Sequence, residues 1–184
     1  MSVPSFFVRW RVRLGYPLAI IVLALARPVP RSILYGALVG AVGLLLRAHA
    51  AGYLHKQEVL TTTGPYAYTR NPLYFGSSIL TLGVAIATWS WFSSIILCSY
   101  FTLFYSIVMR KEEQELRLQH GAAFDRYAQA VPLFLPHFTP ANLAAASPGS
   151  FSFPQYRKNR EYRAAIGFLL VLIVLVVSWR LRLL

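Results

Sequence analysis

Acidic residues and cysteines are scarce in this chain. Only 6 of its 184 residues are Asp or Glu, and it has a single cysteine, Cys98. A lone cysteine excludes an internal disulfide and a cysteine-based metal cluster. The four histidines, at positions 49, 55, 120 and 137, lack metal-ligand spacing, because His49 and His55 are six apart and do not share a helix face. The pattern also contains no Ser-His-Asp arrangement and no phosphate-binding glycine loop.

Charged residues of both signs make up only 13% of the chain, whereas about a quarter is usual in a soluble domain. Hydrophobic residues make up 57%, and they cluster in runs that approach the roughly 20 residues a membrane-spanning helix needs. The composition therefore predicts an all-α integral membrane protein, with residues 1–184 forming a single membrane domain.

The apolar runs predict about five transmembrane helices, at about residues 8–27, 32–54, 72–88, 91–112 and 162–181. The first is expected to be uncleaved, since Arg27-Pro28 follows it in place of a small-residue cleavage site. Ser32 is expected to be the N-cap of the second helix. Three glycines in that helix, Gly36, Gly40 and Gly43, predict close helix packing.

The third predicted helix begins at Asn71-Pro72, since Asn favours the N-cap and Pro the first helical position. A tight turn at residues 89–91 then joins the third helix to the fourth. Tryptophans at both ends of this turn are typical of a membrane interface. The fourth helix continues into the charged residues 110–113, which are expected to leave the membrane.

Basic residues set the expected orientation. The formal net charge is +12, and 14 of the 18 Lys and Arg fall on one side if the N-terminus is cytoplasmic, against 4 on the other. We therefore predict an integral membrane protein with its N-terminus and any active site in the cytoplasm and its C-terminus outside. Membrane lipids are the expected partners of this charge. Nucleic acid is not, because no basic stripe is interleaved with aromatic residues.

Two polar segments flank the predicted hairpin of the third and fourth helices, at residues 64–76 and 110–136. The hairpin brings them to the same side of the membrane. Taken singly, their residues have ordinary explanations: tyrosines of an aromatic belt, a snorkelling Arg70, and a solvated helix face carrying Glu112, Glu113 and Glu115.

Together the segments resemble a known family. The residues that carry the resemblance are Gly64-Pro65-Tyr66-x-Tyr68-x-Arg70-Asn71-Pro72-x-Tyr74-x-Gly76, Glu112-Glu113-x-x-Leu116, Gly121-x-x-Phe124-x-x-Tyr127, Val131-Pro132 and Leu135-Pro136. Over about residues 60–136 the chain is similar to the isoprenylcysteine carboxyl methyltransferases and the related phospholipid methyltransferases. These are membrane enzymes that use S-adenosylmethionine.

The resemblance implies a cytoplasmic cofactor site closed by the segment after the fourth helix. It implies catalytic parts for Arg110 and Glu113, with Arg110 orienting an anionic acceptor. The cofactor-binding residues that it implies are Tyr66, Tyr68, Arg70, Asn71, Pro72, Tyr74, Glu112, Glu113, Leu135 and Pro136. Many members have His at the position of Asn71, so proton transfer there is doubtful, while hydrogen bonding to the cofactor is retained.

The acceptor implied is a lipophilic small molecule or a prenylated or lipid group, and no metal is expected. A carboxylate needs no base to act as a nucleophile, whereas a lipid amine must first lose a proton. The sequence offers no evident buried base, which favours a carboxylate acceptor as in isoprenylcysteine carboxyl methylation. The alternatives are a lipid amine N-methyltransferase and a non-catalytic membrane protein that kept the fold. Sterol reductases of a similar fold have more helices than this chain can supply.

Overall fold

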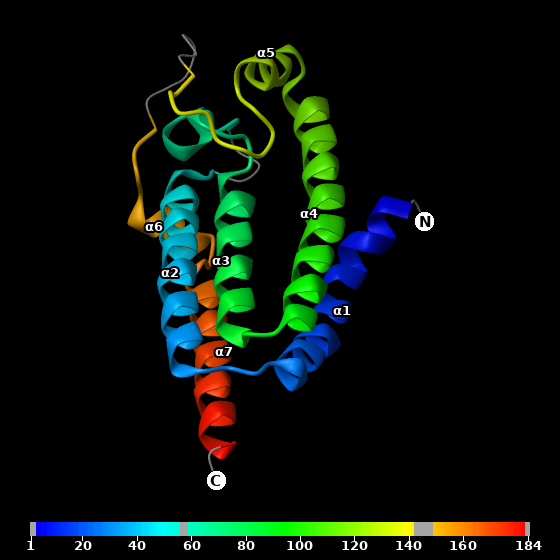
Figure 1. Ribbon diagram of the computed structural model, residues 1–184. Coiled ribbons are helices and arrows are strands. Elements are labelled where there is room, and N and C mark those ends of the chain that lie inside the picture. The colour runs from blue at the N-terminus through cyan, green and yellow to red at the C-terminus, as the bar shows by residue number, and fades with distance from the viewer. Residues whose placement is uncertain (1–2, 56–58, 142–148, 183–184) are drawn as a thin grey trace.

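A computed structural model describes residues 3–55, 59–141 and 149–182, with side chains from Arg13 onward (Figure 1). Every element within these ranges is helical. In chain order they are α1 (Val3–Leu25), α2 (Pro30–Tyr53), the 3-10 helix η1 (Gly64–Ala67), α3 (Pro72–Thr88), α4 (Trp91–His120), α5 (Ala122–Ala130), α6 (Phe153–Lys158) and α7 (Tyr162–Leu181).

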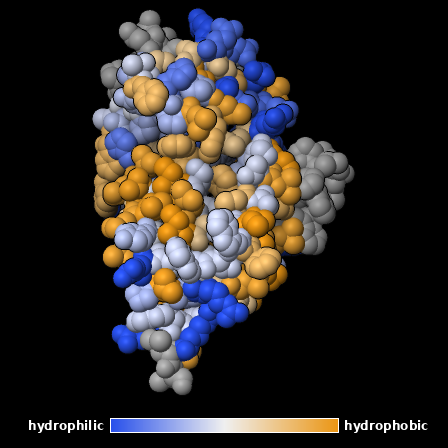
Figure 2. Space-filling view, in the orientation of Figure 1, coloured by the Kyte–Doolittle hydropathy of each residue, from blue (hydrophilic) through white to orange (hydrophobic). Residues whose placement is uncertain are grey.

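Three of the described helices, α2, α4 and α7, are long and apolar enough to cross a membrane. The apolar part of α1, Arg13–Leu25, and the 17 residues of α3 are shorter. At 1.5 Å per residue α3 is about 25 Å long, close to the lower limit for a span. Figure 2 shows a hydrophobic band across the middle of this face, with hydrophilic residues at both ends. The predicted all-helical membrane protein is confirmed, and the count of five spans stays a prediction.

Two of the long helices differ from their predicted limits. The first begins at Val3 rather than near residue 8 and keeps Pro17 in its interior. The fourth continues to His120 rather than 112, because Arg, Lys, Glu, Gln and Leu favour the helix. It ends where Gly121 adopts a φ of 50°, a left-handed value that favours glycine.

The predicted N-cap Ser32 is wrong by one turn. Val29 occupies the N-cap and Pro30 begins α2. The Ser32 hydroxyl instead accepts a hydrogen bond from the Val29 N–H at 3.1 Å and donates to the Ala87 carbonyl at 3.1 Å. Pro fits at the first helical position, where its missing N–H costs nothing. The helix therefore begins at Pro30, before the predicted start.

Glycines allow α2 to lie directly against its neighbours, which confirms the predicted close packing. A Cβ at Gly36 or Gly43 would overlap the backbone of α3, and one at Gly40 would overlap the ring of Phe168 on α7. Further along, Leu175 of α7 packs with Ala26 and Ala87 in a small buried cluster. The helix α7 therefore contacts both α2 and α3 along its length.

Candidate functional site

The two predicted polar segments are joined by backbone hydrogen bonds above the first turn of α3. The Arg70 N–H donates to the Pro132 carbonyl, the His137 N–H to Tyr68 and the Ala141 N–H to Ala67, each at 2.9 Å. The Thr69 hydroxyl adds a 2.9 Å bond to the Phe134 carbonyl. The prediction that the hairpin brings these segments together is confirmed.

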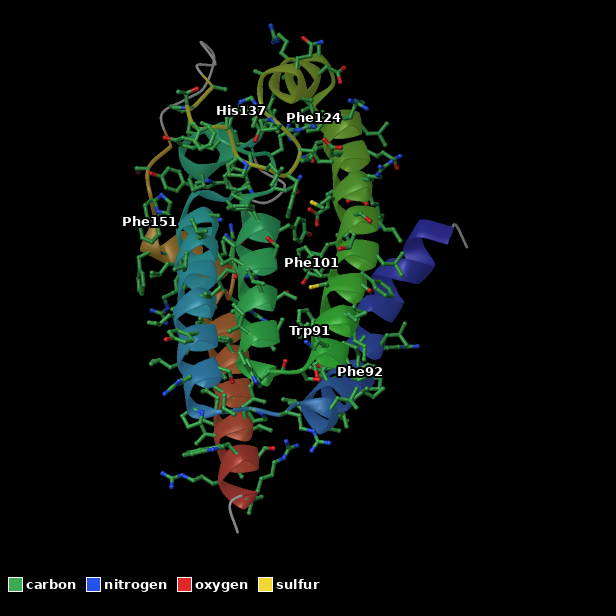
Figure 3. The ribbon with its side chains drawn as sticks, in the orientation of Figure 1. Trp91, Phe92, Phe101, Phe124, His137 and Phe151 are labelled. Atoms are coloured by element: carbon green, nitrogen blue, oxygen red, sulfur yellow. The ribbon has the colours of Figure 1, made fainter. Side chains whose placement is uncertain are left out.

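A short helix fixes this arrangement from the other side. Phe124, Tyr127 and Val131, from α5 and the residue after it, form a buried cluster. Figure 3 labels Phe124 beside α5. The Tyr127 hydroxyl donates to the Tyr66 carbonyl at 2.8 Å, which ties α5 to η1. These residues of the sequence motif therefore hold the segment in place through packing.

An ion pair between Arg70 and Glu113 lies at the centre of the candidate site. The two residues are 43 positions apart, and their side chains are 14% and 22% exposed. The Arg70 Nε–H is buried and has no hydrogen-bond partner among the described residues. Arg70 is thus neutralised by one carboxylate and still has an open donor.

The next carboxylate along α4 is also engaged. The Tyr74 hydroxyl donates to Glu112 Oε1 at 2.6 Å, and the Tyr74 ring stands edge-on to Tyr105 at 5.3 Å between centroids. Glu115 is exposed and pairs instead with Lys111 at 3.3 Å. The face of α4 that meets α3 therefore carries Glu112 and Glu113.

Tyr66, on η1, is a buried phenol beside these charges. Burial raises the pKa of its hydroxyl well above the usual value, and the nearby Tyr127, Glu112 and Glu161 raise it further. Burial likewise raises the pKa of Tyr127, although Arg70 opposes the rise. Both phenols therefore stay protonated at neutral pH, and the Tyr127 hydroxyl donates a hydrogen bond.

Asn71 holds the motif to the distal segment. It occupies the N-cap of α3 as predicted, but its side chain makes no capping bond. Its Nδ2 donates to the Leu133 carbonyl at 2.9 Å, and Pro72 behind it is buried. The Asn71 amide thus donates to a backbone carbonyl, a bond that needs only its N–H donor and no titrating group.

The four remaining candidate residues form no side-chain hydrogen bond or ion pair with this centre among the described residues. Tyr68 is 37% exposed and Leu135 is 70% exposed. Pro136 is half-buried, and Arg110 is exposed on α4, one turn before Glu113. The structure therefore brings together Arg70 with Glu113 and Tyr74 with Glu112, and leaves these four at the margin.

Sequence reasoning missed a second ion pair next to the site. Arg47 of α2 pairs with Glu161, the residue before α7, with 2.6 Å between Nη2 and Oε2. Arg47 Nη1 donates to the Leu73 carbonyl at 3.3 Å and also bonds the Ser77 hydroxyl. The one available signal was an arginine inside an apolar run, since charges within a span are rare and usually functional.

An apolar cavity of about 520 Å³ opens further along the same helix pair. It is lined by the last two turns of α3, the first two turns of α4 and the Trp89–Trp91 turn. Its volume lies in the range of roughly 300–1,000 Å³ typical of ligand pockets. From Tyr74 to Leu82, the first lining residue on α3, the helix rises about 12 Å.

The site offers an open guanidinium donor beside carboxylates and phenols. That set suits a ligand carrying both a carboxylate and an ammonium or ribose hydroxyls. Within the described parts of the chain, no group of three or more His, Cys, Asp or Glu is arranged to hold a metal ion.

Comparison with known proteins gives a family match and three relatives. The model of the family described as phospholipid methyltransferase matches residues 32–122. The nickel-cobalt-cadmium resistance protein NccN of Alcaligenes xylosoxydans xylosoxydans is 36% identical over 46% of this chain and 39% of its own length. The cobalt-zinc-cadmium resistance protein CzcN of Cupriavidus metallidurans is 29% identical over 71% of this chain and 63% of its own length.

The third relative is the protein-S-isoprenylcysteine O-methyltransferase of Schizosaccharomyces pombe. It is 30% identical over 45% of this chain and 35% of its own length. The chain thus spans between about a third and two thirds of these relatives. No solved structure matches it.

Proposed function

We propose that this chain, which matches the phospholipid methyltransferase family over residues 32–122, is an integral membrane methyltransferase that uses S-adenosylmethionine and methylates a lipophilic carboxylate. The observation that carries the proposal is the Arg70–Glu113 ion pair with its open Arg70 Nε–H. It joins the two halves of the resemblance, and both residues fall within the family match.

The residues at the site fit the cofactor's polar groups. Arg70 would hold the carboxylate through its open donor, a charge-assisted bond. Glu112 and Glu113 would accept from the ammonium or the ribose hydroxyls, and the tyrosines would donate or place a ring face against a cation. When bound, S-adenosylmethionine supplies a methyl group on a positively charged sulfur, which keeps the electron pair of the broken S–C bond.

We infer a carboxylate nucleophile because the candidate bases of the site are already engaged. Glu112 already accepts from Tyr74, Glu113 pairs with Arg70, and Asn71 cannot take a proton at neutral pH. A carboxylate oxygen attacks with its own lone pair, forms the C–O bond of a methyl ester and has no proton to lose. An ammonium would need a base that these engaged carboxylates do not readily supply.

A lipophilic acceptor suits the surroundings of the site. The apolar cavity between α3 and α4 lies along the same helix pair as Tyr74 and Glu112. A lipophilic acceptor can place its apolar chain there, while the cofactor arrives from the cytoplasm. Transfer between two positioned reactants gains its rate largely from orientation.

Two measurements test the proposal. S-adenosylhomocysteine should stabilise the detergent-solubilised protein against heat, by roughly 2.7 kcal/mol at a hundred times its dissociation constant. Labelled methyl should pass from S-adenosylmethionine into a lipid extract, and the product should release labelled methanol in base, as a methyl ester does.

Each negative outcome selects a different alternative. An unchanged melting curve at millimolar ligand favours a non-catalytic protein that kept the fold. A labelled product that is stable to base favours a lipid amine N-methyltransferase.

A further inference from the structure

Arg47 is a charged residue in the last third of an apolar helix. Its side chain is 17% exposed, and α2 is one of the three helices able to span a membrane. Charged groups in such segments are costly and usually face a partner or a water-filled cavity. Arg47 therefore needs an anion, and the structure supplies it from Glu161.

The chain is shaped to accommodate this arginine. A Cβ at Gly76, a residue of the family-like motif, would lie 2.8 Å from Arg47 Cγ. The absence of a side chain at Gly76 lets the arginine stem pass α3 and reach the Leu73 carbonyl and Ser77. A larger residue at position 76 would meet both the arginine stem and, at 2.9 Å, the Gly43 carbonyl of α2.

Arg47 and Arg70 share an unusual state. Each is paired with one carboxylate, and each has a buried Nε–H without a hydrogen-bond partner in the described residues. An orphaned buried donor of this kind carries a desolvation cost that a bound acceptor removes. A methyltransferase for carboxylates binds two anionic groups, the carboxylate of the cofactor and that of the acceptor.

The two arginines lie at different depths. Arg70 precedes α3, whereas Arg47 contacts that helix at Leu73 and Ser77. From Pro72 to Ser77 the helix rises about 7.5 Å, so Arg47 is the deeper of the two. A cofactor from water reaches Arg70 first, and an acceptor from the bilayer reaches Arg47.

We propose that Arg47 binds the carboxylate of the lipophilic acceptor, and that Glu161 occupies this position while the acceptor is absent. The proposal rests on the proposed function and assigns the residue that binds the acceptor's carboxylate. Glu161 lies beyond the residues matched by the family model.

Arg110, the residue expected from sequence to orient the acceptor, fits this task less well. It is exposed on α4, where water competes for its hydrogen bonds, and it forms no ion pair within the described residues. The competing explanation for Arg47 and Glu161 is an anchor that does no more than fasten α7 to α2 and α3.

Binding measurements separate the two explanations without requiring turnover. The probes are N-acetyl-S-farnesylcysteine, a lipophilic carboxylate, and its uncharged carboxamide, each titrated in detergent with S-adenosylhomocysteine present. The wild-type protein should bind the carboxylate at least tenfold more tightly than the carboxamide. Arg47→Met should abolish this preference, and Arg47→Lys should keep part of it. Arg182→Gln, which alters an arginine bonded to the Ala26 carbonyl at the opposite end of α7, is the matched control and should keep all of it.

The sign of the Glu161→Gln effect is decisive. Removing the resident anion should lower the melting temperature of the free protein, tighten carboxylate binding severalfold and enlarge the thermal shift that the carboxylate produces. A plain anchor predicts the same loss of melting temperature with no gain in carboxylate affinity, and that result would overturn the proposal even if Arg47→Met fails to fold. Equal affinity of the wild type for both probes would also overturn it. Failure of the proposed function is seen separately, as absent S-adenosylhomocysteine binding or absent methyl transfer.

Discussion

The ion pairs described in this protein differ in how far they are removed from water. A partly buried pair such as Arg70–Glu113 costs desolvation, and its attraction often does no more than offset that cost. Removing one partner is different, because it leaves a charge without compensation. The exposed pair of Lys111 and Glu115 has no such penalty, since exposed pairs contribute little either way. The two kinds of pair should therefore respond very differently to mutation.

The variants Arg70→Ala and Glu113→Ala should each weaken S-adenosylhomocysteine binding by tenfold or more. Loss of a charge-assisted contact of about 1.5–3 kcal/mol is the physical reason. The structure adds that each single variant also leaves its partner partly buried and unpaired, so the melting temperature should fall as well. Calorimetric titration and thermal melts of the purified variants measure the two effects.

Glu115→Ala is the control for this pair, because Glu115 sits on the exposed face of α4. It should leave affinity unchanged and alter stability by under about 0.5 kcal/mol. If Glu115→Ala weakens binding and Glu113→Ala does not, the cofactor lies against a different face of α4.

Tyr127→Phe should lower the free energy of unfolding by about 1 kcal/mol, the usual net contribution of a hydrogen bond. It removes the donor to the Tyr66 carbonyl and leaves that buried acceptor unpaired. The ring keeps its packing against Phe124, so helical content measured by circular dichroism should not change.

The same two tyrosines predict a dependence on alkaline pH. Their pKa values are raised in the folded state, so the unfolded state loses its protons first as pH rises. The stabilisation is complete below the ordinary tyrosine pKa of 10.0 and is lost above it. Melting temperature should fall above pH 10, and less steeply in Tyr127→Phe; equal slopes in both proteins would contradict this origin.

At the scale of elements, α2 and α3 approach each other backbone to backbone because glycines face their contact. Gly36 and Gly43 could be read as packing glycines from their spacing alone, since small residues at such intervals suit helix association in lipid. The short helices α5 and α6 could not be found in this way. Their 9 and 6 residues are too few for the long apolar runs that identified the other helices, although Phe124, Tyr127 and Val131 recur at the spacing of one helix face.

Gly43→Ala should destabilise the protein by about 1–3 kcal/mol, the usual effect of overpacking. Its Cβ would meet the backbone of α3 at Leu80 and Gly76, which cannot rotate away. Gly167→Ala is the matched control, because a Cβ there meets nothing within 4 Å. Unfolding of both variants in detergent should show a loss only for Gly43→Ala.

The turn between α3 and α4 allows a test of orientation. Trp91 is 85% exposed, so Trp91→Cys in a Cys98→Ala background should react with an impermeant thiol reagent from outside intact cells. The reason is the excess of basic residues predicted for the cytoplasmic side. A cysteine at Leu118, 88% exposed near the other end of α4, should react only after the membrane is opened; the reverse pattern would invert the predicted topology.

At the scale of the whole molecule, the sequence predicted what depends on long apolar runs and on an ordered motif. The five longest helices lie where those runs lie, and the two polar segments meet as the hairpin requires. Arg47 and Glu161 escaped because their contact links positions 114 apart, and nothing local to either residue indicates the other. The N-cap of α2 was assigned wrongly for the opposite reason. Ser32 and Pro30 both signal a helix start, and the helix begins at the proline.

The 114 positions between Arg47 and Glu161 have a consequence for biosynthesis. At about 5–20 residues per second, a ribosome needs roughly 6–23 s to make the residues between Arg47 and its counterion. During that interval α2 must enter the bilayer with an uncompensated guanidinium, or wait at the interface until α7 emerges. Because an uncompensated charge within a span is costly, we expect α2 to wait at the interface until Glu161 has been made. A nascent chain arrested before Glu161 should then leave α2 accessible to water-soluble reagents.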